Sequence, residues 1–455
     1  MVMKSRNGDA PDADLADLIP RLARASVLVV GDLMLDRYVY GAVSRISPEA
    51  PVPVLSVDRE VALPGGAGNV LRNLTALGAA CAFISVVGDD QAGSDLTGLI
   101  GGQPNVEPWL LVQGGRCTTI KTRFVASGQQ LLRTDQEVTG AIHPKLADRL
   151  CRIAGDALLA TSVTVLSDYR KGVLSGDVVV RIIASAKAAS RRVLVDAGAD
   201  FARYAGADVV CVTARDLGVA AADAAAIEAA GVAAIAAHGF GALVVHRGVD
   251  GIALVSAAGC QLWPPALPHL AEHPGSRDTL VAALAASLAA GGKLPAACRV
   301  AALALGVAAS RPGIAVAENR DVLAMLTPQG RAQRKIMAPE LAAEHTARWR
   351  ELGLSTAFLA VAAATDVASG IAAAGAGCER LVVGVEVADD AAGSDAVVAL
   401  LARLAARVEV DAVCLYTPAA RVGNVTALRP DVVSVAAGGD LAVLVRGWGG
   451  VLREV

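Results

Sequence analysis

Short runs of β-branched and other apolar residues alternate along the chain with Ala- and Leu-rich stretches of helical length. Strands buried on both faces read as continuous apolar runs, and their alternation with helices is typical of a mainly parallel sheet. The first part of the chain is therefore predicted to form a doubly wound α/β domain. Its expected strands are 26–30, 82–87, 164–166, 192–196, 208–212 and 242–245.

Two further patterns complete this first domain, which is expected to span 1–326. Apolar helices are predicted over 278–290 and 295–310, each followed by Gly or Pro residues that end a helix. Segments 38–58 and 116–135 carry alternating, partly polar residues. That alternation predicts a small β-lid added to the sheet.

A second, smaller unit is expected at the C-terminal end. Segment 327–340 contains Pro, Gly and several basic residues, which indicates a linker. After it, 341–455 is predicted to form a Rossmann-like α/β domain that opens with a helix over 341–352. Its expected strands are 357–361, 380–385, 412–416 and 431–435.

Composition and charge exclude several classes of function. Of 455 residues, 54% are hydrophobic and 3% aromatic, and the net charge is −3. Nucleic-acid binding is not expected without a basic surface or aromatic stacking platforms. No apolar stretch reaches the roughly 20 residues of a membrane-spanning helix. The N-terminus lacks an apolar signal-peptide core, and the eight cysteines are scattered singly, so we expect a soluble cytoplasmic protein with reduced thiols.

Three polar segments carry candidate chemistry. Asp32 and Asp36 follow the first predicted strand, at the edge where open α/β sheets bind ligands. Gly65, Gly66 and Asn69 form a glycine-rich turn before a helix, where backbone can approach a ligand and an amide can bind hydroxyls. Together these residues favour a polyol ligand, although a lone aspartate or glycine turn at such a place can also be purely structural.

The third segment, 275–279, lies directly before the first apolar helix. Backbone N–H groups at a helix N-terminus can bind a phosphoryl group, and Asp278 could take a proton from a sugar hydroxyl. The alternative is that Asp278 simply caps the helix.

Four longer segments resemble a known family, the bifunctional heptose-7-phosphate kinase/ADP-heptose synthases of lipopolysaccharide precursor synthesis. Its kinase half is a ribokinase-like (PfkB) sugar kinase. The resemblance covers nearly the whole chain. The segments read GDLMLDRYVYGAVSRISPEAPVPVLSV, LPGGAGNVLRNLTALGA, RCTTIKTRFVASGQQLLRTDQE and LSDYRKGVL.

The resemblance implies ATP-dependent phosphorylation of D-glycero-D-manno-heptose 7-phosphate at its anomeric hydroxyl, with Mg²⁺, and a homodimer paired through the lid. It makes Asp278 the base and Gly275, Ser276 and Arg277 the anion hole. The residues implied to contact ATP are Thr213, Asp216 and Asp168. The residues implied to hold the sugar phosphate are Asp32, Asp36, Gly65, Gly66, Asn69, Arg45, Lys121, Arg123, Gln129, Arg133 and Lys171.

The chain departs from the family pattern in both halves. Arg277 stands where the family has a glycine, and no histidine follows His345, so the His-x-Gly-His motif of the transferase half is missing. We expect the second domain to be inactive as an adenylyltransferase, because imidazoles stabilise the charge on the triphosphate. The alternative is a non-catalytic protein that binds sugar phosphate or nucleotide.

Overall fold

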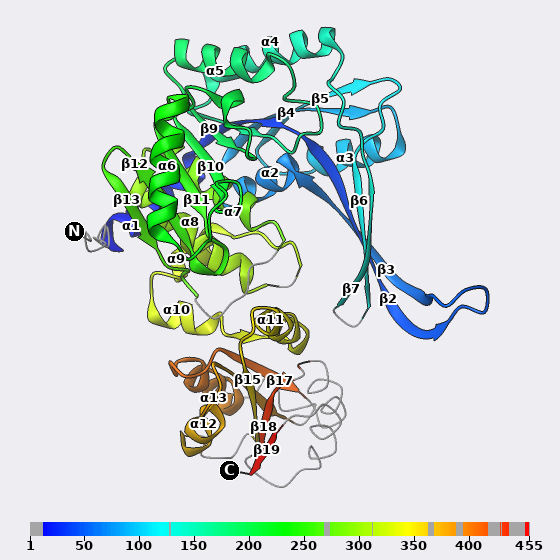
Figure 1. The fold of residues 1–455 in the computed structure, drawn as a ribbon, viewed down its shortest axis with the longest axis vertical. Coiled ribbons are helices and arrows are strands. Elements are labelled where there is room, and N and C mark those ends of the chain that lie inside the picture. Colours follow the sequence, from blue (N-terminus) through cyan, green and yellow to red (C-terminus); the bar gives the residue numbers. More distant parts are fainter. Residues whose placement is uncertain are drawn as a thin grey trace.

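Figure 1 shows two units of secondary structure joined by a short crossing segment, in a computed structural model of the chain. The residues that the structure describes are 12–126, 129–267, 274–311, 313–362, 368–387, 395–416, 428, 430–435 and 451–454. Within them, no helix combines the length and apolar character needed to cross a membrane.

A nine-stranded sheet forms the centre of the first unit, in the order β13-β12-β11-β10-β9-β8-β1-β4-β5 among the described residues. In this sheet, β5, β4, β1, β8, β9, β10 and β11 pair in parallel with their neighbours, whereas the pairs β11–β12 and β12–β13 are antiparallel. The bounds are β1 Ser26–Gly31, β4 Ala80–Gly88, β5 Val106–Gln113, β8 Val163–Ser167, β9 Arg192–Asp196, β10 Val209–Thr213, β11 Ala242–His246, β12 Ile252–Ser256 and β13 Gly259–Trp263.

Helices cover both faces of this sheet, which makes three layers. In β1, Val27 and Val29 belong to one buried cluster, and Leu28 and Val30 belong to another on the opposite face. The helices of the first face are α1 Asp12–Arg21, α2 Ala67–Ala76, α3 Gln91–Gly101, α7 Ser276–Ala289, α8 Leu294–Ala309 and α9 Asn319–Ala324; those of the second are α4 Pro144–Ala160, α5 Val178–Ala188 and α6 Ala224–His238. The doubly wound α/β prediction is confirmed.

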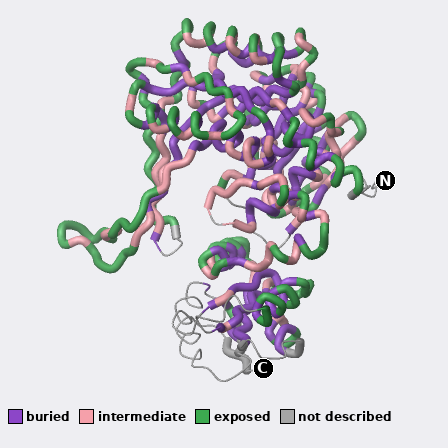
Figure 2. Tube along the Cα trace, turned by 180° about the vertical axis from the view of Figure 1, so that it is seen from behind, coloured by how far each residue is buried: buried purple, intermediate pink, exposed green. Residues whose placement is uncertain are grey.

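The expected lid is a four-stranded sheet in the order β3-β2-β6-β7. Its strands are β2 Leu33–Ile46, β3 Pro53–Gly66, β6 Ile120–Ala126 and β7 Gln129–Gln136. The antiparallel pair β2–β3 projects beyond the body as a long arm (Figures 1 and 2). Residues at the start of β2 are buried and those at its outer end are exposed, so only the base of the lid belongs to the core.

Among its described residues, the second unit contains a six-stranded sheet in the order β14-β17-β16-β15-β18-β19, whose strand pairs are all parallel. Strands are β14 Ile336–Met337, β15 Thr356–Ala362, β16 Arg380–Glu386, β17 Ala412–Tyr416, β18 Val432–Val435 and β19 Val451–Glu454; helices are α11 Pro339–Glu351, α12 Ala368–Gly375 and α13 Asp395–Ala405. The four predicted strands of this unit therefore match β15–β18.

The segment predicted as a linker, 327–340, is structured. It contains α10 (Pro328–Gln333) and β14, which pairs with β17 and so adds a strand to the second sheet. The Lys335 ammonium donates to the carbonyls of Arg407 and Val410, at 2.8 and 2.7 Å. Pro328 and Gly330, which indicated a linker, instead belong to a short helix. Pro328 starts it, and Gly330 occupies a position in it that has no room for a side chain.

The close pairing of β1 with β8 yields a test of the fold. A Cβ at Gly31 would lie 2.3 Å from the Ser167 carbonyl oxygen. Gly31→Ala should therefore push the two strands apart and cost roughly 1–3 kcal/mol, as overpacking does. Thermal unfolding should show a Tm lower by roughly 2–10 °C. In Gly98→Ala, on α3, the new Cβ meets nothing within 4 Å. This control should raise Tm slightly, because alanine favours helix, and a fall of similar size in both variants would contradict the packing described.

Candidate active site

The N-terminus of α7 faces the carboxyl ends of the central strands. Gly275 precedes the helix with a φ of +88°, and a Cβ there would lie 2.6 Å from the Asn69 Nδ2. Both the left-handed backbone and the close approach require glycine. The N–H groups of the first turn of a helix have no acceptors within it, and the helix dipole makes this end positive. The turn can therefore bind an anion.

Asp278 lies in this first turn and is buried, with 5% of the residue exposed. The Asn69 Nδ2 donates to one carboxylate oxygen at 2.7 Å, and the Tyr169 hydroxyl donates to the other. Burial, followed by repulsion from Asp196, raises the pKa of Asp278 to about 7 against the pull of these two donors and of Arg277. A carboxyl group with a pKa near neutrality is suited to exchange a proton with a substrate.

The Arg277 side chain turns towards the ends of β9 and β10. Its Nε lies 2.6 Å from the Asp196 Oδ1, and its Nη1 lies 3.7 Å from the Asp216 carboxylate. The left-handed φ of this turn falls on Gly275 and not on Arg277, so the arginine causes no backbone strain. Attraction from Asp196 raises the pKa of Arg277, which is therefore a fixed positive charge beside the anion site.

The sugar-side residues that gather near Asp278 come from the base of the lid and from α2. The Asp36 Oδ1 lies 2.5 Å from the Arg123 guanidinium, and a Cβ at Gly65 would lie 2.0 Å from the other Asp36 oxygen. The structure thus brings Asp36, Gly65, Asn69 and Arg123 to one side of the α7 turn. Gly66, with a φ of +59°, is the N-cap of α2, three residues before Asn69.

Asp32 does not lie as expected. It is fully buried, and its carboxylate accepts the N–H groups of Tyr169, Lys171 and Val173, each at 2.9 Å. These bonds satisfy the buried charge and shape the loop after β8. The expected sugar contact is corrected to a structural one, because no part of the Asp32 carboxylate faces the crevice.

Four basic residues of the lid and of the loop after β8 differ in their surroundings. Lys121 pairs with Asp135 at 2.7 Å, Arg133 pairs with Asp135 at 2.9 Å, and Lys171 pairs with Glu137 at 2.7 Å. Arg45 lies on the exposed outer part of β2, nine residues beyond Asp36, which is roughly 30 Å along a strand. Within one chain the structure does not bring Arg45 to the site. The Gln129 side chain lies outside the described residues.

Two of the expected nucleotide contacts lie together at the end of β10. The Asp216 carboxylate accepts the N–H and the hydroxyl of Thr213, at 2.8 and 2.7 Å. Asp168 is a correction: its carboxylate is buried and bonded to the Tyr204 hydroxyl at 2.8 Å, with Arg203 at 2.9 Å and the Arg170 N–H at 2.8 Å. It anchors the loop after β8 and does not face the crevice.

Sequence reasoning missed three residues of this site. Tyr169 and Asp196 contact Asp278 and Arg277, and the Arg72 guanidinium donates to the Asn69 amide oxygen at 3.0 Å. Asp196 ends a correctly predicted strand, and Tyr169 directly follows Asp168. Their position at strand ends was the signal that could have found them.

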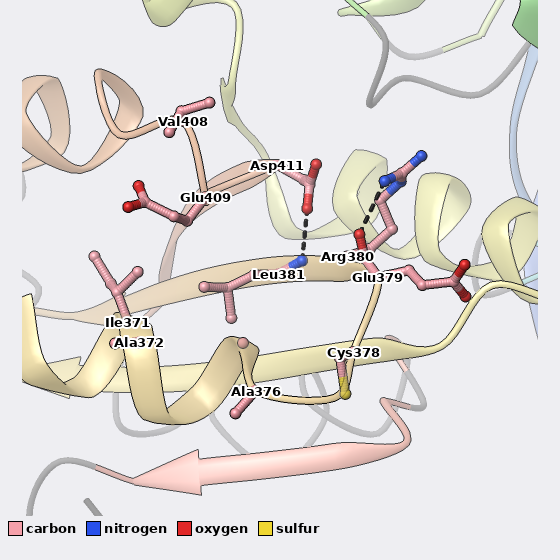
Figure 3. Close-up of a pocket in the computed structure, with 11 residues that line it drawn as sticks. Ile371, Ala372, Ala376, Cys378, Glu379, Arg380, Leu381, Val408, Glu409 and Asp411 are labelled. Atoms are coloured by element: carbon pink, nitrogen blue, oxygen red, sulfur yellow. Dashed lines mark hydrogen bonds between the residues drawn. The ribbon is translucent and has the colours of Figure 1, made fainter.

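A cavity of about 430 Å³ lies in the second unit. Figure 3 shows that it opens around the start of β16, where the Leu381 N–H donates to the Asp411 carboxylate at 2.6 Å. This is the amino end of the sheet, opposite to the edge where open α/β sheets bind ligands. The segments that follow β15, β16 and β17, residues 363–367, 388–394 and 417–427, lie outside the described residues.

Comparison with known proteins shows which protein family the chain belongs to. The profile described as pfkB family carbohydrate kinase matches residues 24–319, and the chain belongs to this family. The crystal structure of phosphofructokinase-2 from Escherichia coli in complex with potassium is 20% identical with a TM-score of 0.56, covering 66% of this chain and 99% of that one. Arabidopsis thaliana ribokinase, complexed with ribose and ATP, is 18% identical with a TM-score of 0.53, covering 67% and 98%. At such identities the likeness shows the fold.

Relatives that cover both units narrow the assignment. Curated proteins named bifunctional protein HldE match from Acidiphilium cryptum (strain JF-5), at 47% identity over 440 residues, and from Rhodospirillum rubrum, at 38% over 443 residues. The first match covers 93% of this chain and 90% of the relative. The chain is thus a carbohydrate kinase of the HldE type, and the family resemblance seen in the sequence is confirmed.

The raised pKa of Asp278 predicts a pH-dependent stability. Because the pKa is about 7 in the folded chain and 3.8 is its ordinary value, the folded state holds an extra proton between these values. Because the folded state binds this proton more tightly than the unfolded state does, the proton adds to the unfolding free energy at low pH, and this contribution is lost as pH rises towards 7. The native chain should therefore lose roughly 1–3 kcal/mol of unfolding free energy between pH 5 and pH 8 through this group, whereas Asp278→Asn should not. The difference in unfolding free energy, variant minus native, should rise by that amount over this range.

Chemical denaturation at several pH values measures this difference. The matched control is Asp148→Asn, since the Asp148 side chain is 67% exposed on α4. If the difference in unfolding free energy between Asp278→Asn and the native chain changes with pH as little as that of the control, the raised pKa of the buried Asp278 carboxyl group is contradicted.

Proposed function

We propose that this carbohydrate kinase transfers the γ-phosphoryl group of ATP to the anomeric hydroxyl of D-glycero-D-manno-heptose 7-phosphate. The observation that carries the proposal is the buried Asp278 carboxylate in the first turn of α7, between a sugar-side group and an anion-binding helix end. The four segments that resemble the heptose kinases, and relatives named HldE, support this acceptor. The reaction would belong to ADP-heptose synthesis for lipopolysaccharide, in the cytoplasm.

On the sugar side, Asp36, Asn69 and the backbone at Gly65 and Gly66 would bind the hydroxyls. A carboxylate accepts hydroxyl protons and an amide both donates and accepts, so this set suits a polyol. Lys121, Arg123, Arg133, Lys171 and Gln129 would lie around the acceptor's phosphate. Ion pairs link the four basic residues to Asp36, Asp135 and Glu137, so an acceptor phosphate would compete with these carboxylates for them.

At the reacting centre, Asp278 would remove the proton from the anomeric hydroxyl as that oxygen forms a bond to the γ-phosphorus. The bond from phosphorus to the β,γ-bridging oxygen breaks, and ADP leaves with that electron pair. The N–H groups at Gly275, Ser276 and Arg277 and the Arg277 guanidinium would stabilise the charge on the moving phosphoryl group. Catalysis rests on position and electrostatics, without a covalent intermediate on the protein.

The nucleotide would lie along the ends of β9 and β10. The described residues contain no group of three side chains suited to hold a metal ion. A Mg²⁺ ion that arrives bound to the phosphate oxygens of ATP needs only one or two protein carboxylates. The residues at the end of β10 fit an ion of that kind. Asp216 and Thr213 are the residues that would face it, and the ion would supply neutralising charge on the phosphates.

The second unit would not transfer adenylyl groups. The absence of any histidine after His345 supports this proposal, because no imidazole is available to bind the triphosphate. Its parallel sheet is retained, and its α11 packs into the same buried apolar cluster as α8 and α9 of the kinase unit. Its role would be structural, and a separate enzyme would complete the nucleotide transfer.

We also propose that the kinase is a homodimer that pairs through the lid. Ile46 of β2, Val57 of β3, Leu132 of β7 and Val52, directly before β3, are between 51% and 61% exposed. Exposed apolar side chains gathered on one sheet are typical of an interaction surface. Light scattering at micromolar concentration should give twice the chain mass, and a monomer would contradict the dimer.

A coupled assay for ADP release tests the proposed reaction. With ATP and heptose 7-phosphate, Asp278→Asn should lower kcat by about 10²–10⁴-fold, the usual contribution of a general base. Phosphorus NMR should show an anomeric phosphate on the product of the native chain and no ADP-heptose. Asp148→Asn should turn over at the native rate. Tight binding of the sugar phosphate without turnover in the native chain would favour the non-catalytic alternative.

Arg277→Gly tests whether the arginine belongs to the site or obstructs it. Its removal leaves the buried Asp196 carboxylate without its cation, so stability should fall by roughly 1–3 kcal/mol, an effect reduced by the partial exposure of Arg277. The value of kcat should fall by roughly 10–100-fold, as expected when a charge-assisted contact is lost. Arg277→Lys should retain an intermediate rate. A gain in rate for Arg277→Gly, measured in the same assay, would show that the arginine blocks the phosphoryl site.

A further inference from the structure

The loop that follows β8 wraps around one buried carboxylate. Asp32 is fully buried, and the N–H groups of Tyr169, Lys171 and Val173 each donate to it at 2.9 Å. Alternate residues of the loop therefore point their amides at a single charge. Because a buried carboxylate needs such donors, the loop cannot move without leaving the charge of Asp32 unsatisfied.

The same loop is fixed from its other side. The Arg116 guanidinium donates to the carbonyl of Lys171 and, at 3.0 Å, to that of Gly140. Arg170 adopts a φ of +56°, a left-handed conformation that L side chains rarely take. Such a conformation persists where the surroundings determine the backbone, and such positions are concentrated at functional sites.

What this loop holds in place is the ring of Tyr169. The hydroxyl donates to the Asp278 Oδ1, while the Asn69 Nδ2 donates to Oδ2 at 2.7 Å. The ring lies beside Gly66, where a Cβ would be 3.4 Å from the Tyr169 Cδ2, and the Arg277 guanidinium carbon is 5.7 Å from the ring centroid. Two donors from different elements therefore fix the rotation of the Asp278 carboxylate.

We propose that Tyr169 is a positioning residue for Asp278, and that Asp32 acts through it by fixing the loop. The Tyr169 hydroxyl holds the carboxylate so that its remaining lone pairs face the acceptor hydroxyl. This inference rests on the proposed role of Asp278 as the base. It assigns functions to Tyr169, which the family motifs left without a role, and to Asp32, whose carboxylate has no access to the sugar.

The charged and polar groups that face Asp278 come from four elements. Asp196 of β9 opposes ionisation, whereas Arg277 of α7, Arg72 of α2, Asn69 of α2 and Tyr169 favour it. Since the Tyr169 hydroxyl donates to the ionised form, its removal should raise the pKa of Asp278 further. A residue that only supported the fold would not change that pKa selectively.

Tyr169→Phe removes the hydroxyl and keeps the ring. With ATP and heptose 7-phosphate, kcat should fall by about 10–100-fold, the effect of losing one hydrogen bond to a charged group. The KM values should stay within about twofold, because the hydroxyl does not bind substrate. The acidic limb of the pH–rate profile should move up by about one pH unit.

Tyr204→Phe is the matched control. The Tyr204 hydroxyl also donates to a buried carboxylate, that of Asp168, at 2.8 Å. Its loss should leave the acidic limb in place. A profile for Tyr169→Phe that coincides with that of Tyr204→Phe would overturn the inference.

A direct titration separates this inference from the proposed reaction. In the full chain labelled with ¹³C at aspartate carboxyls, and assigned with Asp278→Asn, the Asp278 signal should titrate about one pH unit higher in Tyr169→Phe. This readout needs no turnover. An unchanged midpoint would contradict the role of Tyr169, whereas native activity in Asp278→Asn would instead contradict the proposed base and the inference that rests on it.

Discussion

The burial of the Asp278 carboxylate is the constraint on which the rest of the site depends. A carboxylate removed from water costs several kcal/mol unless hydrogen bonds replace its hydration. Here the donors come from α2 and from the loop after β8, so three separate parts of the chain must meet at the first turn of α7. Gly275 permits that meeting because any side chain there would collide with Asn69.

The charges around this carboxylate are divided between two sides of the crevice. Towards β9 and β10, Arg277 neutralises Asp196 and lies near Asp216. Towards the lid, Arg123 neutralises Asp36. A phosphoryl group entering between them would meet one arginine and a positive helix end on the nucleotide side, and a polyol would meet an acid and an amide on the sugar side. In the proposed reaction, this division would hold ATP and the sugar on opposite sides of Asp278.

The pattern of apolar runs was sufficient to predict the fold, because alternating strands and helices leave few other arrangements. It also placed Asn69 and Asp278 correctly at the starts of helices and Thr213 at the end of a strand, whereas Asp36, expected just after the first strand, lies inside β2. It could not tell that Asp32 and Asp168 turn inward, since that depends on amides and side chains from segments far away in sequence. For the same reason the position of Tyr169 after β8 could not show that its hydroxyl reaches Asp278. The linker was misread because β14 is only two residues long and is held by pairing with β17.

The central claim is that the turn before α7 receives a phosphoryl group despite Arg277. A crystal structure with a non-hydrolysable ATP analogue and heptose 7-phosphate tests it most directly. The γ-phosphate should lie against the N–H groups of 275–278, with Arg277 turned to it and the acceptor oxygen within hydrogen-bond distance of Asp278. A guanidinium still bound to Asp196, with the phosphate excluded from the turn, would contradict the account.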